Sequence, residues 1–287
     1  MTAWLVYRLK DVERNKAYIE FYKEEGKALA INIKLILVDK LKFGVKDNNL
    51  FIEYDGKPIK RPDFVINRFI YPLLTKHLED MKIKVFNNSK VANICNDKAK
   101  TYQYISRLKI PVIDTNFIKS EYLSQAIEDI KEATIIKGVS GHGGNQVYLL
   151  NPEDEEAKKQ KIVSKLKNSD LVLQPLVGSN NQDLRVYIIG KKIIAAILRT
   201  AKSGFKSNFS LGGEVKKYDL SEKEISLINC IINEFDFGLV GIDFLIDNDG
   251  NLLFNEIEDV VGARMLYQCT DINLVNLYLK HIISQII

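Results

Sequence analysis

The sequence predicts an α/β protein built from lobes of mixed helix and strand. Short apolar runs alternate with polar segments that carry apolar residues at helical spacing, which is typical of α/β folds. The length of 287 residues exceeds one minimal domain, so about two domains or several lobes are expected. An apolar fraction of 46% and a charged fraction of 27% are ordinary for a globular chain.

Residues 1–90 are expected to form an α/β lobe. Apolar runs predict strands, and the polar segment with Ala17, Phe21 and Ala28 at helical spacing predicts a helix. The strands are expected at 3–7, 33–38, 50–54 and 64–68, and the helix at 12–29.

Two further lobes are expected over 91–170 and 171–287. In the first, helices are predicted at 97–108, 123–131 and 152–168, and strands at 116–119, 134–137 and 146–150. In the second, strands are predicted at 171–177, 183–189 and 192–199, helices at 221–234 and 274–287, and a strand pair within 241–258.

Composition argues against several classes of protein. The net charge is only +4 and no dense Lys/Arg block occurs, so nucleic-acid binding is not expected. The sequence contains no run of 18 apolar residues, so a membrane span is not expected. The chain has three cysteines, Cys95, Cys230 and Cys269, and an odd number fits a protein of the reducing cytoplasm. They are too widely scattered to form a zinc-binding motif. The N-terminus lacks the apolar core of a signal peptide.

The most informative segment is Gly241–Glu258, two apolar runs around a polar turn. Asp243 lies on the first run, and Glu256 and Glu258 share one face of the second. If the runs pair as a hairpin, Asp243 can lie opposite these glutamates, and three converging carboxylates favour a divalent cation such as Mg²⁺. A solvated charged edge is the alternative, but Phe244, Leu252 and Phe254 argue against it.

A glycine-rich segment, Ser140–Gly144, lies between two predicted strands. It precedes no helix, so it is neither a P-loop nor a Rossmann turn. Such a loop can still fold over phosphates and donate backbone N–H groups, although it can equally be an ordinary hairpin loop. Lys137 just before it, and Lys98 at a helix start, can contact phosphate or simply be solvated.

Two other segments carry candidate ligand contacts. Pro175 interrupts the run Leu171–Val177; its carbonyl can accept from an adenine amino group while the Leu176 N–H donates back, unless the segment is a plain edge strand. Arg185 and Arg199 lie in apolar strands, where arginine is costly unless it is paired. They can bind a carboxylate or phosphate, or form internal salt bridges to Asp183 or Glu214.

The order of these motifs resembles the ATP-grasp superfamily, and most closely its RimK-like ligases, over residues 90–287. The series begins with Lys98, Lys137 and the glycine loop and ends with Gly241-Ile-Asp243 and Asn255-Glu-Ile-Glu258. The resemblance implies an ATP-grasp fold in which two lobes clamp ATP behind an N-terminal α/β lobe of residues 1–90.

The resemblance also implies roles for individual residues. Asp243, Glu256 and Glu258 correspond to ligands of Mg²⁺, with Mn²⁺ as an alternative to it. The implied nucleotide contacts are Lys98, Lys137, Ser140, Gly141, Gly143, Gly144, Gln174, Pro175, Leu176, Asp183, Lys206, Ser207 and Asn208. Glu258 departs from the pattern, because the family usually has Glu-x-Asn in the last strand. The segment Asp259–Met265 also replaces the usual continuation, so substrate identity does not transfer.

The implied reaction joins a carboxylate to an amine through an acyl phosphate, with amino-acid or peptide substrates. Arg199 and Arg185 are expected to stabilise the carboxylate and the oxyanion, and Arg68 and Arg264 to contact substrate. Two alternatives are an ATP-grasp kinase that phosphorylates a hydroxyl and a non-catalytic nucleotide-binding module. A homo-oligomer is also possible, because the helix at 274–287 can form core or interface.

Overall fold

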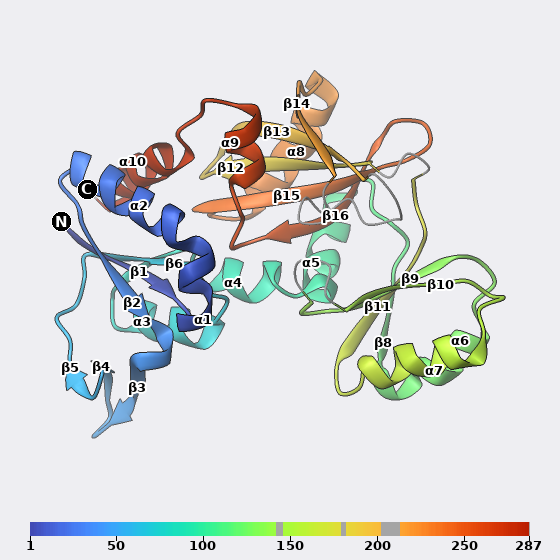
Figure 1. The fold of residues 1–287 in the computed structure, drawn as a ribbon, viewed down its shortest axis with the longest axis horizontal. Helices are drawn as coiled ribbons and strands as arrows, with labels where there is room; N and C mark the ends of the chain where they lie inside the picture. The colour runs from blue at the N-terminus through green and yellow to red at the C-terminus, as the bar shows by residue number, and fades with distance from the viewer. Residues whose placement is uncertain (142–145, 179–181, 202–212, 287) are drawn as a thin grey trace.

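The computed structural model describes residues 1–141, 146–178, 182–201 and 213–286 (Figure 1). The structural statements below concern these residues. Gly143, Gly144, Lys206, Ser207 and Asn208 lie outside them, so their expected nucleotide contacts stay predictions.

The N-terminal part of the chain forms a parallel sheet in the order β2-β1-β6-β7. Its strands are β1 (Thr2–Tyr7), β2 (Asn32–Leu37), β6 (Phe64–Asn67) and β7 (Lys84–Phe86), and its helices are α1 (Leu9–Val12), α2 (Lys16–Ala28) and α3 (Pro72–Asp80). β1 is central and apolar along its length because both its faces are covered. Leu5 and Tyr7 enter one hydrophobic cluster, whereas Trp4 and Val6 enter another.

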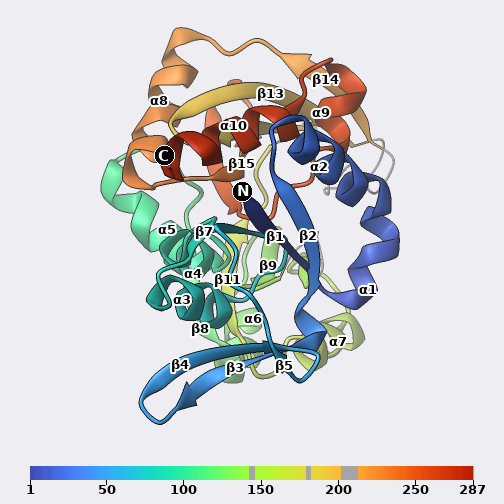
Figure 2. The same cartoon turned by 90° about the vertical axis from the view of Figure 1, so that its left-hand side faces the viewer.

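A small antiparallel sheet leaves this lobe between β2 and β6. It comprises β3 (Leu41–Lys46), β4 (Asn49–Tyr54) and β5 (Lys57–Pro58), and it projects from the molecule (Figure 2). The sequence predicted only its second strand, as 50–54. Asp47 and Asn48 adopt positive φ (49° and 60°) in the turn between β3 and β4, a conformation that Asp and Asn tolerate better than most residues.

Two short helices lead from the first lobe to the rest of the chain, α4 (Ser89–Cys95) and α5 (Lys98–Ile105). Asn88 caps α4 by accepting from the Val91 N–H, and Asp97 caps α5 by accepting from the Lys100 N–H. The predicted helix over 97–108 therefore begins where expected, although its last turn is a 3₁₀ helix over Ser106–Leu108.

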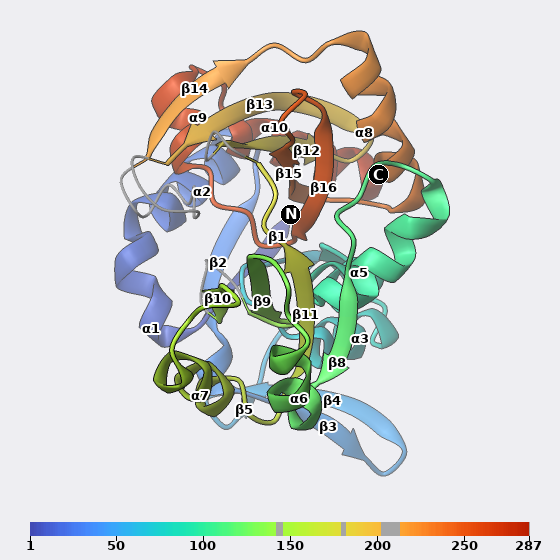
Figure 3. The ribbon, with the colours of Figure 1, turned by 90° about the vertical axis from the view of Figure 1, so that its right-hand side faces the viewer.

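The second sheet is antiparallel in the order β10-β9-β11-β8 (Figure 3). Its strands are β8 (Asn116–Lys119), β9 (Thr134–Gly138), β10 (Val147–Leu150) and β11 (Asp170–Pro175), and its helices are α6 (Leu123–Glu128) and α7 (Glu156–Lys165). β9 and β10 pair with Val147 opposite Lys137, which confirms the predicted strand–loop–strand arrangement. α7 starts four residues later than the predicted 152–168.

The third sheet is antiparallel in the order β14-β13-β12-β15-β16. Its strands are β12 (Gln182–Ile189), β13 (Lys192–Thr200), β14 (Glu214–Tyr218), β15 (Leu239–Ile246) and β16 (Leu252–Glu258), and the helices around it are α8 (Glu222–Glu234), α9 (Arg264–Cys269) and α10 (Leu274–Ile286). Val186 and Ile242 face the cluster that includes α8, whereas Tyr187 and Leu239 face a cluster shared with α2 and α10.

The shared cluster joins the first and third sheets into one core. Leu5 from β1, Tyr22 from α2, Ile197 from β13 and Leu279 from α10 all belong to it. The apolar stripe of α10 is thus buried in the core of the chain itself. The proposed division at residue 90 separates two sheets, but this core spans it. No described helix is long and apolar enough to cross a membrane.

Candidate active site

The acidic hairpin forms as the sequence predicted. β15 and β16 pair antiparallel, with Asp243 opposite Glu256 and Gly241 opposite Glu258, and the register shifts between Asp243 and Phe244. The connecting turn requires positive φ at Gly250 (82°), which glycine adopts without steric cost. The two predicted arms therefore carry their carboxylates to neighbouring positions of one sheet.

Asp243 lies inside a network of buried charges on the third sheet. Arg185 donates to its two oxygens from Nε (2.8 Å) and Nη2 (2.6 Å), and Arg199 Nη2 donates to Oδ2 (2.8 Å). The side chain of Asp243 is only 2% exposed. Burial alone would raise the pKa of Asp243, but the two guanidinium groups outweigh it and hold that pKa at about 2.

The same network includes Asp183 and Glu258. Arg199 binds Asp183 through Nε and Nη2, the latter at 2.7 Å, and Arg185 Nη1 forms an ion pair with Glu258. Burial raises the pKa of Asp183 and of Glu258, against the effect of the arginines. Of the two interpretations of Arg199, the structure thus contains the internal salt bridge, and its partners are Asp183, as expected, and Asp243.

Two residues with expected nucleotide contacts have protein partners in the structure, and their nucleotide contacts stay predictions. Asp183 is buried in its ion pair with Arg199, so a contact with ribose requires that pair to rearrange. The Leu176 N–H donates to the Ala133 carbonyl (2.8 Å) because the chain continues the sheet pairing past Pro175, so it is not available to adenine. The Gln174 side chain is buried and donates to Thr115.

The two predicted phosphate lysines contact adjacent residues of β16, Glu256 and Asn255. Lys98 Nζ lies 3.2 Å from Glu256 Oε2 and also donates to the Gly141 carbonyl at the start of the glycine loop. Lys137 Nζ donates to Asn255 Oδ1 (3.0 Å). Burial would raise the pKa of Glu256, but Lys98 and Lys137 lower it overall. Ser140 is exposed just before Gly141.

Lys137 is the lysine most suited to a titration experiment. Burial and the neighbouring charge of Lys98 lower its pKa to about 8, although Glu256 opposes the shift. Because the protonated amine attracts phosphate, ATP is expected to bind more weakly as pH rises through 8, by at most about tenfold per pH unit. Equilibrium binding of a non-hydrolysable ATP analogue between pH 6.5 and 9.5 measures this.

The matched control for this titration is Lys137→Arg. Arginine stays charged over the whole range, so the variant is expected to lose the dependence centred near pH 8. An unchanged pH profile in Lys137→Arg would exclude Lys137 as its source.

The predicted metal ligands are only partly assembled. Among the residues the structure describes, no group of three or more His, Cys, Asp or Glu side chains is arranged to hold a metal ion. Asp243 is turned to the arginines, whereas Glu256 and Glu258 keep 34% and 31% of their side-chain surface exposed. Glu258 Oε2 contacts Arg185 without a regular hydrogen bond. Lys98 and Arg185 thus supply the positive charge next to these two glutamates.

Sequence reasoning missed several residues that shape this region. Asn255 accepts a hydrogen bond from Lys137. Its position directly before Glu256 was the only feature of the sequence that could have placed it in the site. Asp259 accepts from Asn87 (Oδ1) and from Asn96 (Oδ2, 2.9 Å), which ties the end of β16 to the first lobe. Burial raises the pKa of Asp259. Nothing in the sequence signals contacts that span more than 160 residues.

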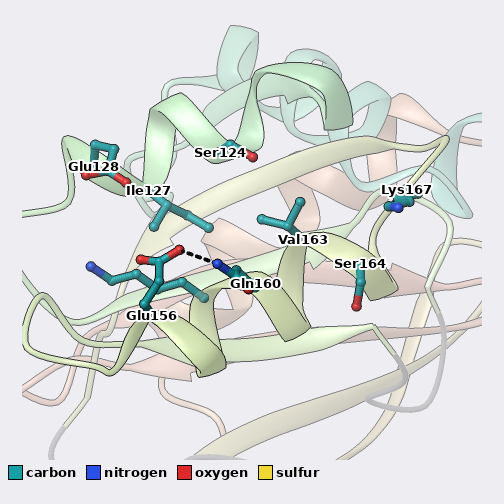
Figure 4. A pocket seen from close by; sticks show the side chains of 9 residues that line it. Ser124, Ile127, Glu128, Glu156, Gln160, Val163, Ser164 and Lys167 are labelled. Atoms are coloured by element: carbon teal, nitrogen blue, oxygen red, sulfur yellow. Dashed lines mark hydrogen bonds between the residues drawn. The ribbon is translucent and has the colours of Figure 1, made fainter.

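A separate pocket lies between α6 and α7, with a volume of about 180 Å³. Figure 4 shows its lining, in which Gln160 donates to Glu156 (3.2 Å). None of its lining residues belongs to the predicted site, so it is not the candidate active site.

Solved structures share this fold. D-cycloserine synthetase DcsG matches with a TM-score of 0.75 at 13% identity, covering 100% of both chains. The ATP-grasp ligase PsnB, in its complex with a minimal precursor, Mg and ADP, matches with a TM-score of 0.68 at 16% identity, covering 99% of this chain and 97% of PsnB. The class of fold is therefore ATP-grasp.

The family follows from the sequence itself. The model of the RimK-like ATP-grasp domain matches residues 95–282, and the chain belongs to this family. The protein is therefore an ATP-dependent carboxylate–amine ligase. This confirms the family and the type of reaction that the motif order implied.

Two relatives extend the similarity to almost the whole chain. The uncharacterized protein MG011 of Mycoplasma genitalium is 27% identical over 286 residues, covering 99% of this chain and 93% of the relative. A probable alpha-L-glutamate ligase of Legionella pneumophila (strain Corby) is 26% identical over 270 residues, covering 91% and 89%.

Proposed function

We propose that the protein joins the carboxylate of one substrate to the amine of an amino acid or peptide, and releases ADP and phosphate. A carboxylate oxygen attacks the γ-phosphorus of ATP, and the bond from this phosphorus to the β–γ bridging oxygen breaks, which gives an acyl phosphate and ADP. The amine then attacks the acyl carbon, phosphate leaves, and the amine loses a proton. The convergence of Lys98, Lys137 and Glu256 supports this proposal.

Each cationic residue has a place in this reaction. Lys98 and Lys137 contact the ATP phosphates, and Lys98 also fixes the start of the glycine loop through Gly141. Arg185 and Arg199 stabilise the oxyanion that develops when the amine attacks, which requires their ion pairs with Asp243 and Asp183 to open. Exclusion of water protects the acyl phosphate from hydrolysis.

Glu256 and Glu258 fit a hard divalent cation. They are neighbouring oxygen donors with partial exposure, and carboxylate oxygens are the ligands that Mg²⁺ prefers. When bound there, Mg²⁺ (or Mn²⁺) would neutralise the negative charge of the phosphates. Asp243 can become a third metal ligand only if its hydrogen bonds to Arg185 and Arg199 break. Relatives named alpha-L-glutamate ligase make glutamate the first substrate to test.

The direct test is an assay with ATP, Mg²⁺ and a panel of carboxylic acids and amino acids. We expect ADP and free phosphate in equal amounts that depend on both substrates, and trapping of the acyl phosphate by hydroxylamine. ADP without free phosphate would instead identify a kinase. ATP binding without turnover over the whole panel would identify a non-catalytic module.

A further inference from the structure

Arg68 is a cation without a paired anion. It follows β6, and its Nη2 donates to the Val261 carbonyl (2.8 Å), while its Nε is buried and has no partner among the described residues. Within those residues it forms no ion pair, and the segments outside them contain no aspartate or glutamate. Asp259, a buried acid whose charge interacts with that of Arg68, accepts hydrogen bonds from Asn87 and Asn96 instead.

Tyrosine hydroxyls gather around this guanidinium. The guanidinium carbon of Arg68, Cζ, lies 5.5 Å from the centroid of the Tyr18 ring. The Tyr18 ring in turn lies next to the rings of Tyr22 and Tyr267, at centroid distances of 5.0 and 6.4 Å. The hydroxyl oxygens of Tyr7, Tyr18, Tyr22 and Tyr267 are buried and make no hydrogen bond of regular geometry among the described residues, although the Tyr18 hydroxyl lies close to those of Tyr22 and Tyr267, and the Tyr7 hydroxyl close to Arg68.

This density of unpaired polar atoms is unusual. Buried hydroxyls and guanidinium nitrogens in folded proteins are normally hydrogen-bonded, and leaving them unpaired destabilises the protein. Tyr7 and Tyr22 are almost fully buried, at 2% and 0% exposed. Arg68 Nε can only donate, and each hydroxyl can donate, so a ligand with acceptor oxygens and negative charge would satisfy these groups together. A carboxylate has both.

Three members of the cluster reach the protein surface. Arg68, Tyr18 and Tyr267 are partly exposed as whole residues, so solvent reaches their outer surfaces although particular polar atoms are buried. The exposed Arg264 lies nearby on the same helix as Tyr267 and donates to the Arg14 carbonyl (3.2 Å). An anionic ligand would therefore enter past arginine side chains.

One segment connects this cluster to the candidate active site. The Val261 carbonyl accepts from Arg68. The Val261 side chain packs against Gly241 so closely that a Cβ added at Gly241 would lie 2.7 Å from Val261 Cγ2, and Arg185 lies on the same side of Gly241. Glu258, three residues before Val261, binds Arg185. The tyrosine cluster and the acidic hairpin are thus on either side of residues 258–261.

We propose that Arg68, with the hydroxyls of Tyr18 and Tyr267, binds the unreacted carboxylate of the amine substrate. The acceptor is then a free amino acid, anchored through its α-carboxylate while its amine reaches the acyl phosphate near Glu256 and Glu258. A guanidinium flanked by hydroxyl donors matches a carboxylate in shape and charge. This inference rests on the proposed ligase function and specifies its second substrate.

The test exploits the unpaired state of the hydroxyls. Tyr18→Phe and Tyr267→Phe remove a hydroxyl that has no partner in the free protein, so both variants are expected to unfold in urea at the same or a higher concentration than the parent. Both should nevertheless bind the amino acid about tenfold more weakly. Tyr218→Phe is the control, because Tyr218 ends β14, donates to Glu224 of α8 and packs against the other core cluster, so binding should not change.

Binding is measured by calorimetry with the twenty proteinogenic amino acids as probes, and with the α-amide of each one that binds. We expect at least one amino acid to bind, and its α-amide to bind at least tenfold more weakly. Equal binding of acid and amide, binding of neither, or unchanged binding in both Tyr→Phe variants would overturn the proposal. Arg68→Lys keeps the positive charge but loses the planar guanidinium, which can bind a carboxylate through two nitrogens, so this variant should weaken binding as well.

These readouts separate the two proposals. If an amino acid binds and the tyrosine variants weaken it, but no acid and amine pair yields ADP and phosphate, then the ligase reaction is wrong and the carboxylate subsite stands. If ligation proceeds equally well with amino acid and α-amide, the ligase stands and the subsite is wrong.

Discussion

Glu256→Gln is expected to lower the rate of ADP formation by about two to three orders of magnitude. The substitution keeps the shape of the side chain but removes the charge that lies 3.2 Å from Lys98 and opposite Asp243. It therefore weakens cation binding and leaves two lysines without their nearest carboxylate. Initial rates of ADP release at saturating ATP, followed by a Mg²⁺ titration, measure both effects.

Two further variants sharpen this prediction. Glu53→Gln alters a partly exposed glutamate on β4, in the projecting sheet, and is expected to leave the rate unchanged. Glu258→Asn introduces the residue that the family usually has here, and should retain activity within about tenfold, since asparagine also offers an oxygen ligand. ADP release at the parental rate in Glu256→Gln would exclude Glu256 from the metal and phosphate site.

Asp243→Asn is expected to destabilise the protein by about 3–5 kcal/mol, because it removes the anion shared by two buried arginines. Arg185 and Arg199 have only 10% and 3% of their side-chain surface exposed, so neither can recover hydration without local unfolding. Urea unfolding at pH 7 measures the loss. Asp80→Asn, which breaks the exposed pair with Lys76, should cost less than about 1 kcal/mol.

The pH dependence gives an independent check. The pKa of Asp243 is about 2 in the folded protein, below its ordinary value of 3.8, so the folded state binds this proton less tightly than the unfolded state. The contribution of Asp243 is therefore complete above about pH 4 and declines as pH falls toward 2. The difference in stability between the parent and Asp243→Asn should shrink over that window; a constant difference would contradict the assignment.

Much of the fold could be predicted from the sequence because local patterns report local structure. The alternation of apolar residues places Asp243 and Glu256 on paired strands, and the glycine loop between two apolar runs indicates a β-hairpin. The projecting sheet was recognised only through β4. Its first strand, β3, carries Gly44 and lysines, and such a strand has a weak apolar signal.

The candidate site was predicted less completely than the fold. The resemblance to the ATP-grasp superfamily brought Lys98, Lys137 and Glu256 into one hypothesis, and the structure places them near one another. The ion pair of Arg199 with Asp183 was only one of the alternatives that the sequence left open, and the donation of the Leu176 N–H to the Ala133 carbonyl was not anticipated. Both depend on which of several possible partners lies closest after the sheets pack, and strand periodicity does not carry that information.

The sequence by itself determined the order of motifs, the acidic hairpin and membership of the RimK-like family, because these follow from residues close together in the chain. Only the tertiary structure decided how the charges are paired and that Tyr7, Tyr18 and Tyr267 gather around Arg68. These residues lie up to 260 positions apart, and they meet because α2, α9 and the first sheet pack on one core. Such contacts depend on how complete elements fit together, which no local pattern specifies.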